Sequence, residues 1–183
     1  MLVLLTAFVV GVAAGYLSGG RLRNLANLTL ARQWLVLAAL GLQIVAFSPA
    51  GAALGQPTTV VLHLTSYALL AWFVVLNRRR FGVSIAGLGL GLNLVTIAAN
   101  GGYMPASKTA LARAGIAYSG DSSNNSAVIS ASTHLGFLGD IFAVPSWMPA
   151  ANVFSIGDLL IVAGIAVLLA SSMRKPRAVA DAQ

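Results

Sequence analysis

The chain has 183 residues, of which 58% are hydrophobic and only 8% are charged. Soluble domains carry roughly 25% charged residues, and a domain of this size buries only about 70% of its surface. A water-soluble core therefore cannot hold this much apolar surface. The chain has no cysteine, which excludes disulfides and thiolate metal sites. The composition predicts an integral membrane protein.

A net charge of +7 could suggest a nucleic-acid partner, but the basic residues stand in short clusters between apolar runs. The clusters are Arg21, Arg23 and Arg32, then Arg78–Arg80, then Arg174, Lys175 and Arg177. Such clusters are typical of cytoplasmic loops, and no basic groove with interleaved aromatic residues is visible. We expect the lipid bilayer, and no nucleic acid, as the partner. Arg78–Arg80 reads as a topology anchor or as an anionic-lipid site.

Five apolar segments approach the roughly 17–25 residues needed to cross a bilayer. They are Leu2–Leu17, Trp34–Phe47 (extended by Ala31 on one side and Ala53 on the other), Val60–Leu76, Val83–Ala99 and Phe154–Ala170. Because backbone polar groups must be paired within each span, we expect helices. The sequence predicts an all-α polytopic bundle of about five transmembrane helices in a single domain, residues 1–173, followed by a disordered basic cytoplasmic tail, residues 174–183.

The basic residues also predict an orientation. Loops 21–32 and 77–82 and the tail each carry three, whereas loop 48–59 has none and segment 100–153 has only Lys108 and Arg113. Basic loops stay inside, so we expect the N-terminus outside and the C-terminus in the cytoplasm. The expected location is the bacterial cytoplasmic membrane.

Segment 100–153 is too polar for a simple crossing and unusually long for a connection. Residues 118–126 are typical of an exposed flexible turn. Before the turn, Ser107 is positioned to cap a helix that runs to Ala114 and stops at Gly115. After it, residues 127–138 are apolar enough to form an interfacial or re-entrant helix.

Acidic residues are few: the chain has four aspartates and no glutamate. Asp140 and Asp158 both map to the outer membrane face, where ionisable groups indicate function. Two carboxylates brought together cannot both ionise easily, and the resulting difference in pKa supplies a base and an acid. We therefore predict a catalytic pair. The competing interpretations are an ordinary turn for Asp140 and, for Asp158, a capping box with Ser155.

Asn152–Ile161, followed by Gly164, resembles the last motif of lipoprotein signal peptidases (type II signal peptidases). The match covers residues 138–165. The resemblance implies that Asp158 and Asp140 are the catalytic pair of an intramembrane aspartic peptidase. Such an enzyme cleaves signal peptides from lipid-modified prolipoproteins, so the implied substrate is a membrane peptide or lipid.

A second likeness spans most of the chain. Asn100–Ser107 and Phe137–Asp140 resemble signatures of an uncharacterised bacterial family of small polytopic membrane proteins, a domain of unknown function. This resemblance implies a membrane location and supplies no activity.

Three further residues, Asn100, His134 and Ser155, are candidates for substrate binding. Asn100 also suits the end of a helix, and His134 lies six residues before Asp140, close enough to pair with it or to stand solvated. Two histidines and four aspartates are too few for an evident metal cluster, so we expect no metal and no cofactor.

Polar and glycine residues inside the apolar segments predict helix packing. Gln43 and Asn93 are expected to join helices by hydrogen bonds, and Gly11-x-x-x-Gly15 and Gly87-x-x-x-Gly91 permit close approach. Three functions stay open: an aspartate-pair enzyme, a non-enzymatic module that binds a partner protein or lipid through segment 100–153, and a transporter or channel subunit. The sequence leaves the oligomeric state open.

Overall fold

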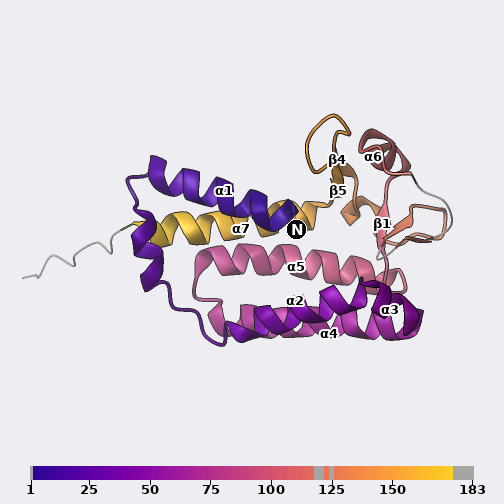
Figure 1. Ribbon diagram of the computed structural model, residues 1–183, viewed down its shortest axis with the longest axis horizontal. Helices are drawn as coiled ribbons and strands as arrows, with labels where there is room; N and C mark the ends of the chain where they lie inside the picture. The colour runs from indigo at the N-terminus through magenta and orange to yellow at the C-terminus, as the bar shows by residue number, and fades with distance from the viewer. Residues whose placement is uncertain (1, 118–121, 124–125, 175–183) are drawn as a thin grey trace, which may run out of the picture.

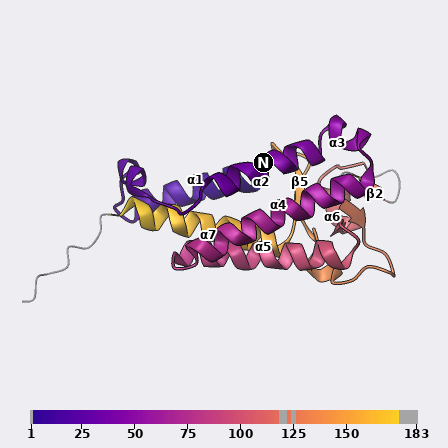
Figure 2. The ribbon, with the colours of Figure 1, turned by 90° about the horizontal axis from the view of Figure 1, so that it is seen from below.

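The computed structural model describes residues 2–117, 122–123 and 126–174, and it is mostly helical. Five apolar helices run along the long axis of the molecule (Figures 1 and 2). They are α1 (Leu2–Leu17), α2 (Trp34–Ala46), α4 (Gln56–Asn77), α5 (Phe81–Ala99) and α7 (Ile156–Met173). α1, α5 and α7 pack side by side, and α2 pairs with α4.

Three of these helices, α4, α5 and α7, are long and apolar enough to cross a membrane, and α1 and α2 are shorter apolar helices. Large apolar side chains cover the outside of the bundle: Leu17 is 90% exposed, Phe81 74% and Leu37 69%. Such a surface fits lipid rather than water. The chain is a membrane protein, and the expectation of five transmembrane helices is confirmed in part: three helices are long enough to span, and two more are apolar but shorter.

The second apolar segment is interrupted. α2 ends at Ala46, and a separate short helix, α3 (Pro49–Ala53), follows it. Proline cannot continue a helix because its ring meets the preceding turn, while the Ser48 hydroxyl accepts a hydrogen bond from the Gly51 N–H and starts α3. The expected extension to Ala53 is therefore not one continuous helix. α4 starts at Gln56, earlier than expected, with Pro57 in its first turn.

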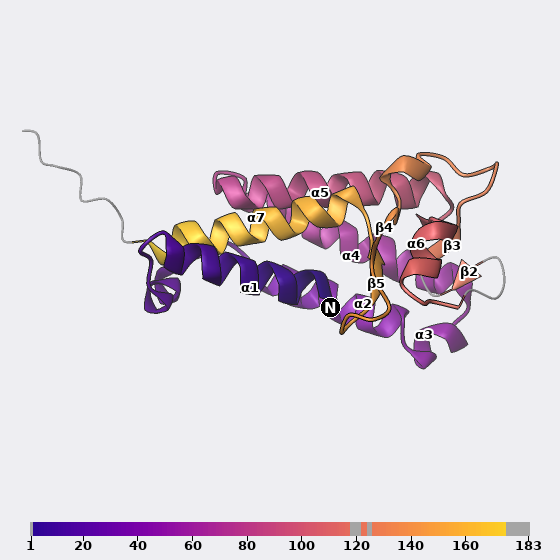
Figure 3. The ribbon, with the colours of Figure 1, turned by 90° about the horizontal axis from the view of Figure 1, so that it is seen from above.

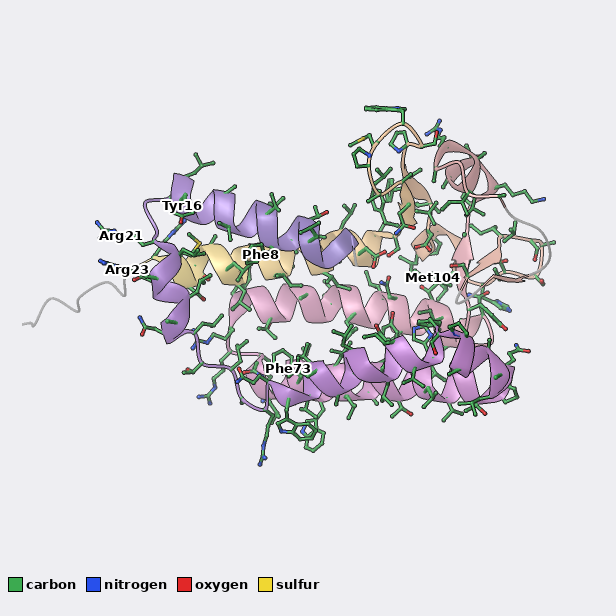
Figure 4. The ribbon with its side chains drawn as sticks, in the orientation of Figure 1. Phe8, Tyr16, Arg21, Arg23, Phe73 and Met104 are labelled. Carbon is green, nitrogen blue, oxygen red and sulfur yellow. The ribbon has the colours of Figure 1, made fainter. Side chains whose placement is uncertain are left out.

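The described residues of the basic clusters lie at one end of the bundle, which we call the basic end. In Figure 4, Arg21 and Arg23 lie there and Met104 lies at the opposite end. A short 3-10 helix, η1 (Leu22–Asn27), closes the basic end. The Asn24 amide donates to the Met173 carbonyl at 2.7 Å, and Arg80 Nη2 donates to the Thr29 carbonyl at 3.3 Å. These bonds tie the first connection to the α4–α5 turn and to the end of α7.

Residues 100–155 form the opposite end, which we call the sheet end (Figure 3). Its elements are β1 (Met104–Ala106), α6 (Lys108–Arg113), β2 (Ser122–Ser123), β3 (Ser126–Val128), η2 (Gly136–Leu138), β4 (Phe142–Val144) and β5 (Asn152–Phe154). β3 pairs with β1 in parallel and with β2 in antiparallel fashion, and β4 pairs with β5. The all-α prediction is thus wrong for this end.

The helix expected over residues 127–138 is also wrong. β3 occupies the first residues of this range, and the Ile129 N–H donates to the Ala106 carbonyl. The backbone hydrogen bonds there are therefore those of a sheet and not of a helix. Leu135 is left-handed, with φ of 52°, which further breaks any helix. The helix after Ser107 is confirmed as α6, which ends at Arg113 and is followed by Gly115 with φ of 66°. The expected cap is not formed, because the Ser107 side chain makes no capping hydrogen bond. The turn expected at 118–126 falls largely, and the tail beyond Arg174 wholly, outside the described residues.

α5 and α7 touch through paired glycines. A Cβ on Gly82 would stand 2.5 Å from the Gly164 carbonyl oxygen, and one on Gly89 would overlap the Gly157 carbonyl oxygen. The glycines are seven residues apart on each helix, and the helices run antiparallel, so each pair meets backbone to backbone. Any side chain at these positions would push the helices apart.

The glycine patterns predicted from sequence are confirmed in part. Gly11 lies against Ala166 and Gly15 against Met173, so the first pattern packs α1 on α7 within the chain. In the second pattern, Gly87 lies against Val74 of α4, whereas Gly91 meets no atom within 4 Å.

The glycine pairing predicts a clear difference between neighbouring positions of α5. Gly89→Ala should destabilise the protein by about 1–3 kcal/mol, since an added methyl group overpacks the α5–α7 contact. Gly91→Ala, its control, should be neutral or slightly stabilising. Thermal unfolding in detergent, followed by circular dichroism, measures both. Equal melting temperatures for the two variants would contradict the packing.

The separation of the basic end from the sheet end makes the predicted orientation testable, and the cysteine-free chain suits single-cysteine labelling. Ala131→Cys at the sheet end and Ala26→Cys at the basic end both replace exposed alanines. We expect a membrane-impermeant maleimide to label only Ala131→Cys on intact cells and both variants after lysis. Labelling of Ala26→Cys alone would reverse the orientation.

Candidate functional site

α7 begins with a capping box at the sheet end. The Ser155 hydroxyl accepts a hydrogen bond from the Asp158 N–H at 2.9 Å, and Asp158 Oδ2 accepts from the Ser155 N–H at 3.1 Å. The capping predicted from sequence is confirmed. It fixes the Asp158 carboxylate at the N-terminus of α7, where the helix dipole favours negative charge.

Asn93 of α5 extends this capping box across the helix interface. Its Nδ2 donates to Asp158 Oδ1 at 3.0 Å, and its Oδ1 accepts from the Ser155 hydroxyl at 2.9 Å. A Cβ on Gly157 would overlap Asn93 Oδ1, so only glycine there lets the amide enter. The expectation that Asn93 joins helices is confirmed, as it is for Gln43, whose amide donates to Ser66 of α4 at 3.0 Å.

Asp140 is held by its backbone rather than by its side chain. Its N–H donates to the Pro105 carbonyl at 2.7 Å, and its carbonyl accepts from the Ser107 N–H at 3.0 Å. Gly139 is required beside it, because a Cβ there would overlap the Pro105 carbonyl oxygen. The two segments that carry the sequence signatures, 100–107 and 137–140, are therefore one unit that presents Asp140.

Asp140 is 9% exposed, and its carboxyl group accepts no hydrogen bond from the described residues. Every fully buried polar side-chain atom in those residues has a hydrogen-bond partner. Because the Asp140 carboxyl oxygens have none, they are not fully buried and remain accessible to a water molecule. Burial, and to a lesser degree the charge of Asp158, raises the pKa of Asp140 to about 7. Asp140 therefore exchanges protons near neutral pH, while the Asp158 carboxylate accepts two hydrogen bonds.

Tyr67 of α4 completes the cluster. It lies within the electrostatic range of both aspartates and packs in the core with Ile97 and Met104. Its ring meets that of His63 at 5.2 Å between centroids, and His63 meets Phe47 at 4.8 Å, both edge to face. Sequence reasoning missed Tyr67 because a single tyrosine in an apolar segment carries no linear signal.

The aromatic row Phe47–His63–Tyr67 runs from the buried core to a cavity of about 240 Å³ at the ends of α2 and α4. Besides Phe47 and His63, its walls include Gln56, Thr59 and Tyr103. The lining combines apolar surface with amide, hydroxyl and imidazole groups and carries no full charge. Such a lining suits an uncharged group with a few hydrogen-bonding atoms.

Asn100 and His134 are joined to each other rather than to the aspartates. The Asn100 amide donates to the His134 carbonyl at 2.8 Å and accepts from the His134 N–H at 2.9 Å, so it fastens the loop before η2 to the end of α5. His134 is exposed, and no hydrogen bond or ion pair links its ring to Asp140. Of the two interpretations of His134, the solvated side chain fits the structure and the pairing with Asp140 does not. The substrate-binding roles of Asn100, His134 and Ser155 stay predictions.

Metal ligands are sparse at this site. In the part of the chain that the structure describes, no three His, Cys, Asp or Glu side chains are grouped so that they could hold a metal ion. Asp140 and Asp158 influence each other through their charges and share no hydrogen bond. The arrangement therefore offers two carboxyl groups of unlike environment, one that accepts hydrogen bonds and one whose pKa burial raises.

Comparison with known families gives one match: the model of a family of unknown function, DUF5317, matches residues 27–170. No curated protein matches the chain, and no solved structure does.

The raised pKa of Asp140 predicts a pH-dependent stability. Between about pH 4 and 7, Asp140 holds its proton in the folded state and loses it in the unfolded state. The protonated carboxyl therefore adds to the free energy of unfolding at low pH, and this stabilisation is lost as the pH rises through 7. The interval from 3.8 to about 7 is worth up to about 4 kcal/mol. We expect Asp140→Asn to unfold at a higher temperature than the parent at pH 8 and at a similar temperature at pH 4.

Thermal scans in detergent across this pH range measure the effect. Asp121→Asn, which removes a carboxyl from the same segment of sequence, serves as the control and should follow the parent. If Asp140→Asn and the parent lose stability in parallel between pH 4 and 8, Asp140 is not the titrating group.

Proposed function

The chain belongs to the DUF5317 family, whose function is unknown, and we propose that it is a membrane-embedded hydrolase in which Asp140 and Asp158 act as a pair. One observation carries the proposal: two carboxyl groups lie within electrostatic range of each other, one held by hydrogen bonds and the other free of them among the described residues. Carboxyl pairs with unlike environments divide the roles of base and acid.

The environments assign the roles. Asp158, whose two oxygens accept from Asn93 and from the Ser155 N–H, is stabilised as a carboxylate and takes a proton from a water molecule. The water oxygen attacks the carbonyl carbon of the substrate. Asp140, which carries its proton up to near neutral pH, donates that proton to the leaving group as the bond to the carbonyl carbon breaks. The proton that Asp158 took from water then passes to Asp140, which returns both carboxyl groups to their starting protonation states.

The substrate class that fits best is a peptide bond at the end of a membrane-spanning segment. The pair lies where α5 ends and α7 begins, at the level where apolar helices give way to polar chain. The local resemblance to type II signal peptidases supports the same class. We infer that the sheet end faces outward from the bacterial cytoplasmic membrane, with the N-terminus outside, because the arginine clusters gather at the other end.

A second candidate function has an observation of its own. Phe137 is 63% exposed, Trp147 80% and Met148 40%, so the sheet end presents apolar side chains to its surroundings. Exposed apolar patches mark binding surfaces. We keep a non-enzymatic module that binds a lipid or partner protein through segment 100–153 as the alternative, and it requires no cooperation between the aspartates.

A covalent probe distinguishes the two candidates without knowledge of the substrate. A small aryl epoxide reacts with an aspartate pair when one carboxylate attacks the epoxide carbon and the other carboxyl protonates the epoxide oxygen. We expect one adduct per chain, on Asp158, found by mass spectrometry of the detergent-solubilised protein. The yield should fall as the pH rises above 7, because Asp140 then loses its proton.

Matched variants decide the outcome. Asp140→Asn and Asp158→Asn should each reduce labelling at least tenfold, to the level of the unfolded chain, while Asp121→Asn should label like the parent. Labelling that persists on Asp158 in Asp140→Asn, with an unchanged pH profile, would show that the carboxyl groups act separately. That result would reject the hydrolase in favour of the binding module.

A further inference from the structure

A second cavity, of about 230 Å³, lies at the basic end, whereas both aspartates belong to the sheet end. η1, the α4–α5 turn and the end of α7 enclose it, and the lining includes Asn24, Asn27, Leu28, Arg80, Ser172 and Arg174. We propose that this cavity binds the phosphate group of an anionic phospholipid.

The charge in the cavity is uncompensated. Two of its lining residues are arginines, and within the described ranges the carboxylates are Asp140 and Asp158, both at the sheet end. Four more arginines stand on the adjoining loops, at positions 21, 23, 78 and 79. An anion placed here would enter a positive field that the described chain does not neutralise.

The cavity also offers more hydrogen-bond donors than acceptors. Arg80 donates one N–H to the Thr29 carbonyl, and the other N–H groups of its guanidinium remain available as donors. The Ser172 hydroxyl and the Asn27 amide have no hydrogen-bond partner among the described residues. A phosphate carries acceptor oxygens only, and arginine forks match its geometry.

Helix ends at the cavity have opposite effects. The C-terminus of α7 contributes partial negative charge, but its Met173 carbonyl already accepts hydrogen bonds from the Asn24 amide and the Arg21 N–H. The N-terminus of α5, for which Arg80 is the N-cap, contributes partial positive charge. The backbone therefore does not oppose an anion.

Neighbouring apolar side chains favour a lipid over free phosphate. Leu28 forms part of the cavity wall, and Leu17, Leu22 and Phe81, all at this end of the bundle, are 90%, 45% and 74% exposed. A headgroup in the cavity would place its acyl chains along this apolar surface. Basic pockets between membrane helices are suited to such headgroups.

The test uses the full chain purified in detergent and three probes: dioleoyl phosphatidylglycerol, dioleoyl phosphatidylcholine and inorganic phosphate. We expect phosphatidylglycerol to raise the melting temperature by several degrees in a saturable manner, and phosphatidylcholine to have no such effect. Inorganic phosphate at the same concentration should have little effect; an equal effect would identify a free phosphate site and overturn the lipid assignment.

The variants test the cavity itself. Arg80→Gln with Arg174→Gln should weaken phosphatidylglycerol binding by about 30-fold, since each arginine near an anionic lipid contributes about 1 kcal/mol and 1.4 kcal/mol is a factor of ten. Lys108→Gln with Arg113→Gln, both in α6, removes two positive charges at the sheet end and should change nothing. Native mass spectrometry counts bound lipid directly, including for a variant with a lowered melting temperature. Parent-like binding by the double variant would overturn the proposal.

Discussion

The backbone contact between α5 and α7 is the constraint on which the rest of the structure depends. Gly82 and Gly89 face Gly164 and Gly157 without intervening side chains. Only at this separation does Asn93 reach both Ser155 and Asp158. The same contact therefore closes the bundle and forms the polar cluster at the sheet end. α1 is secured to α7 in a similar way through Gly11 and Gly15.

The carboxyl groups of Asp140 and Asp158 have different hydrogen-bonding environments because different parts of the fold hold the two residues. Asp158 belongs to a rigid helix start and has its donors within three residues and on the adjacent helix. Asp140 belongs to a strand-like segment whose hydrogen bonds are all made by the backbone, to Pro105 and Ser107. Its carboxyl accepts no hydrogen bond from the described residues, so nothing there offsets the effect of burial, which raises its pKa. Position in the fold, rather than residue type, separates their properties.

Short-range sequence patterns predicted three features. The length of the apolar segments predicted the helices, the Ser-x-x-Asp spacing predicted the capping box, and a single polar residue in an apolar helix, Asn93, predicted the hydrogen bonds between α5 and α7. They could not predict the sheet end. The pairing of β1 with β3 joins residues 20 or more positions apart, and the apolar stretch after residue 126 fits either a helix or a strand. The glycine patterns predicted from sequence have a spacing of four residues, whereas the glycine contacts between α5 and α7 repeat every seven residues. Tyr67 acquires its place only when α4 folds against α5.

The break between α2 and α3 has a consequence for the surrounding lipid. α2 has 13 residues and is about 20 Å long, well short of the roughly 30 Å hydrocarbon layer. A short apolar helix creates hydrophobic mismatch, which the bilayer relieves by becoming thinner beside it. On that flank, headgroups and water are drawn down toward Phe47 and His63. A thinner bilayer beside α2 shortens the distance between bulk water and the aromatic row.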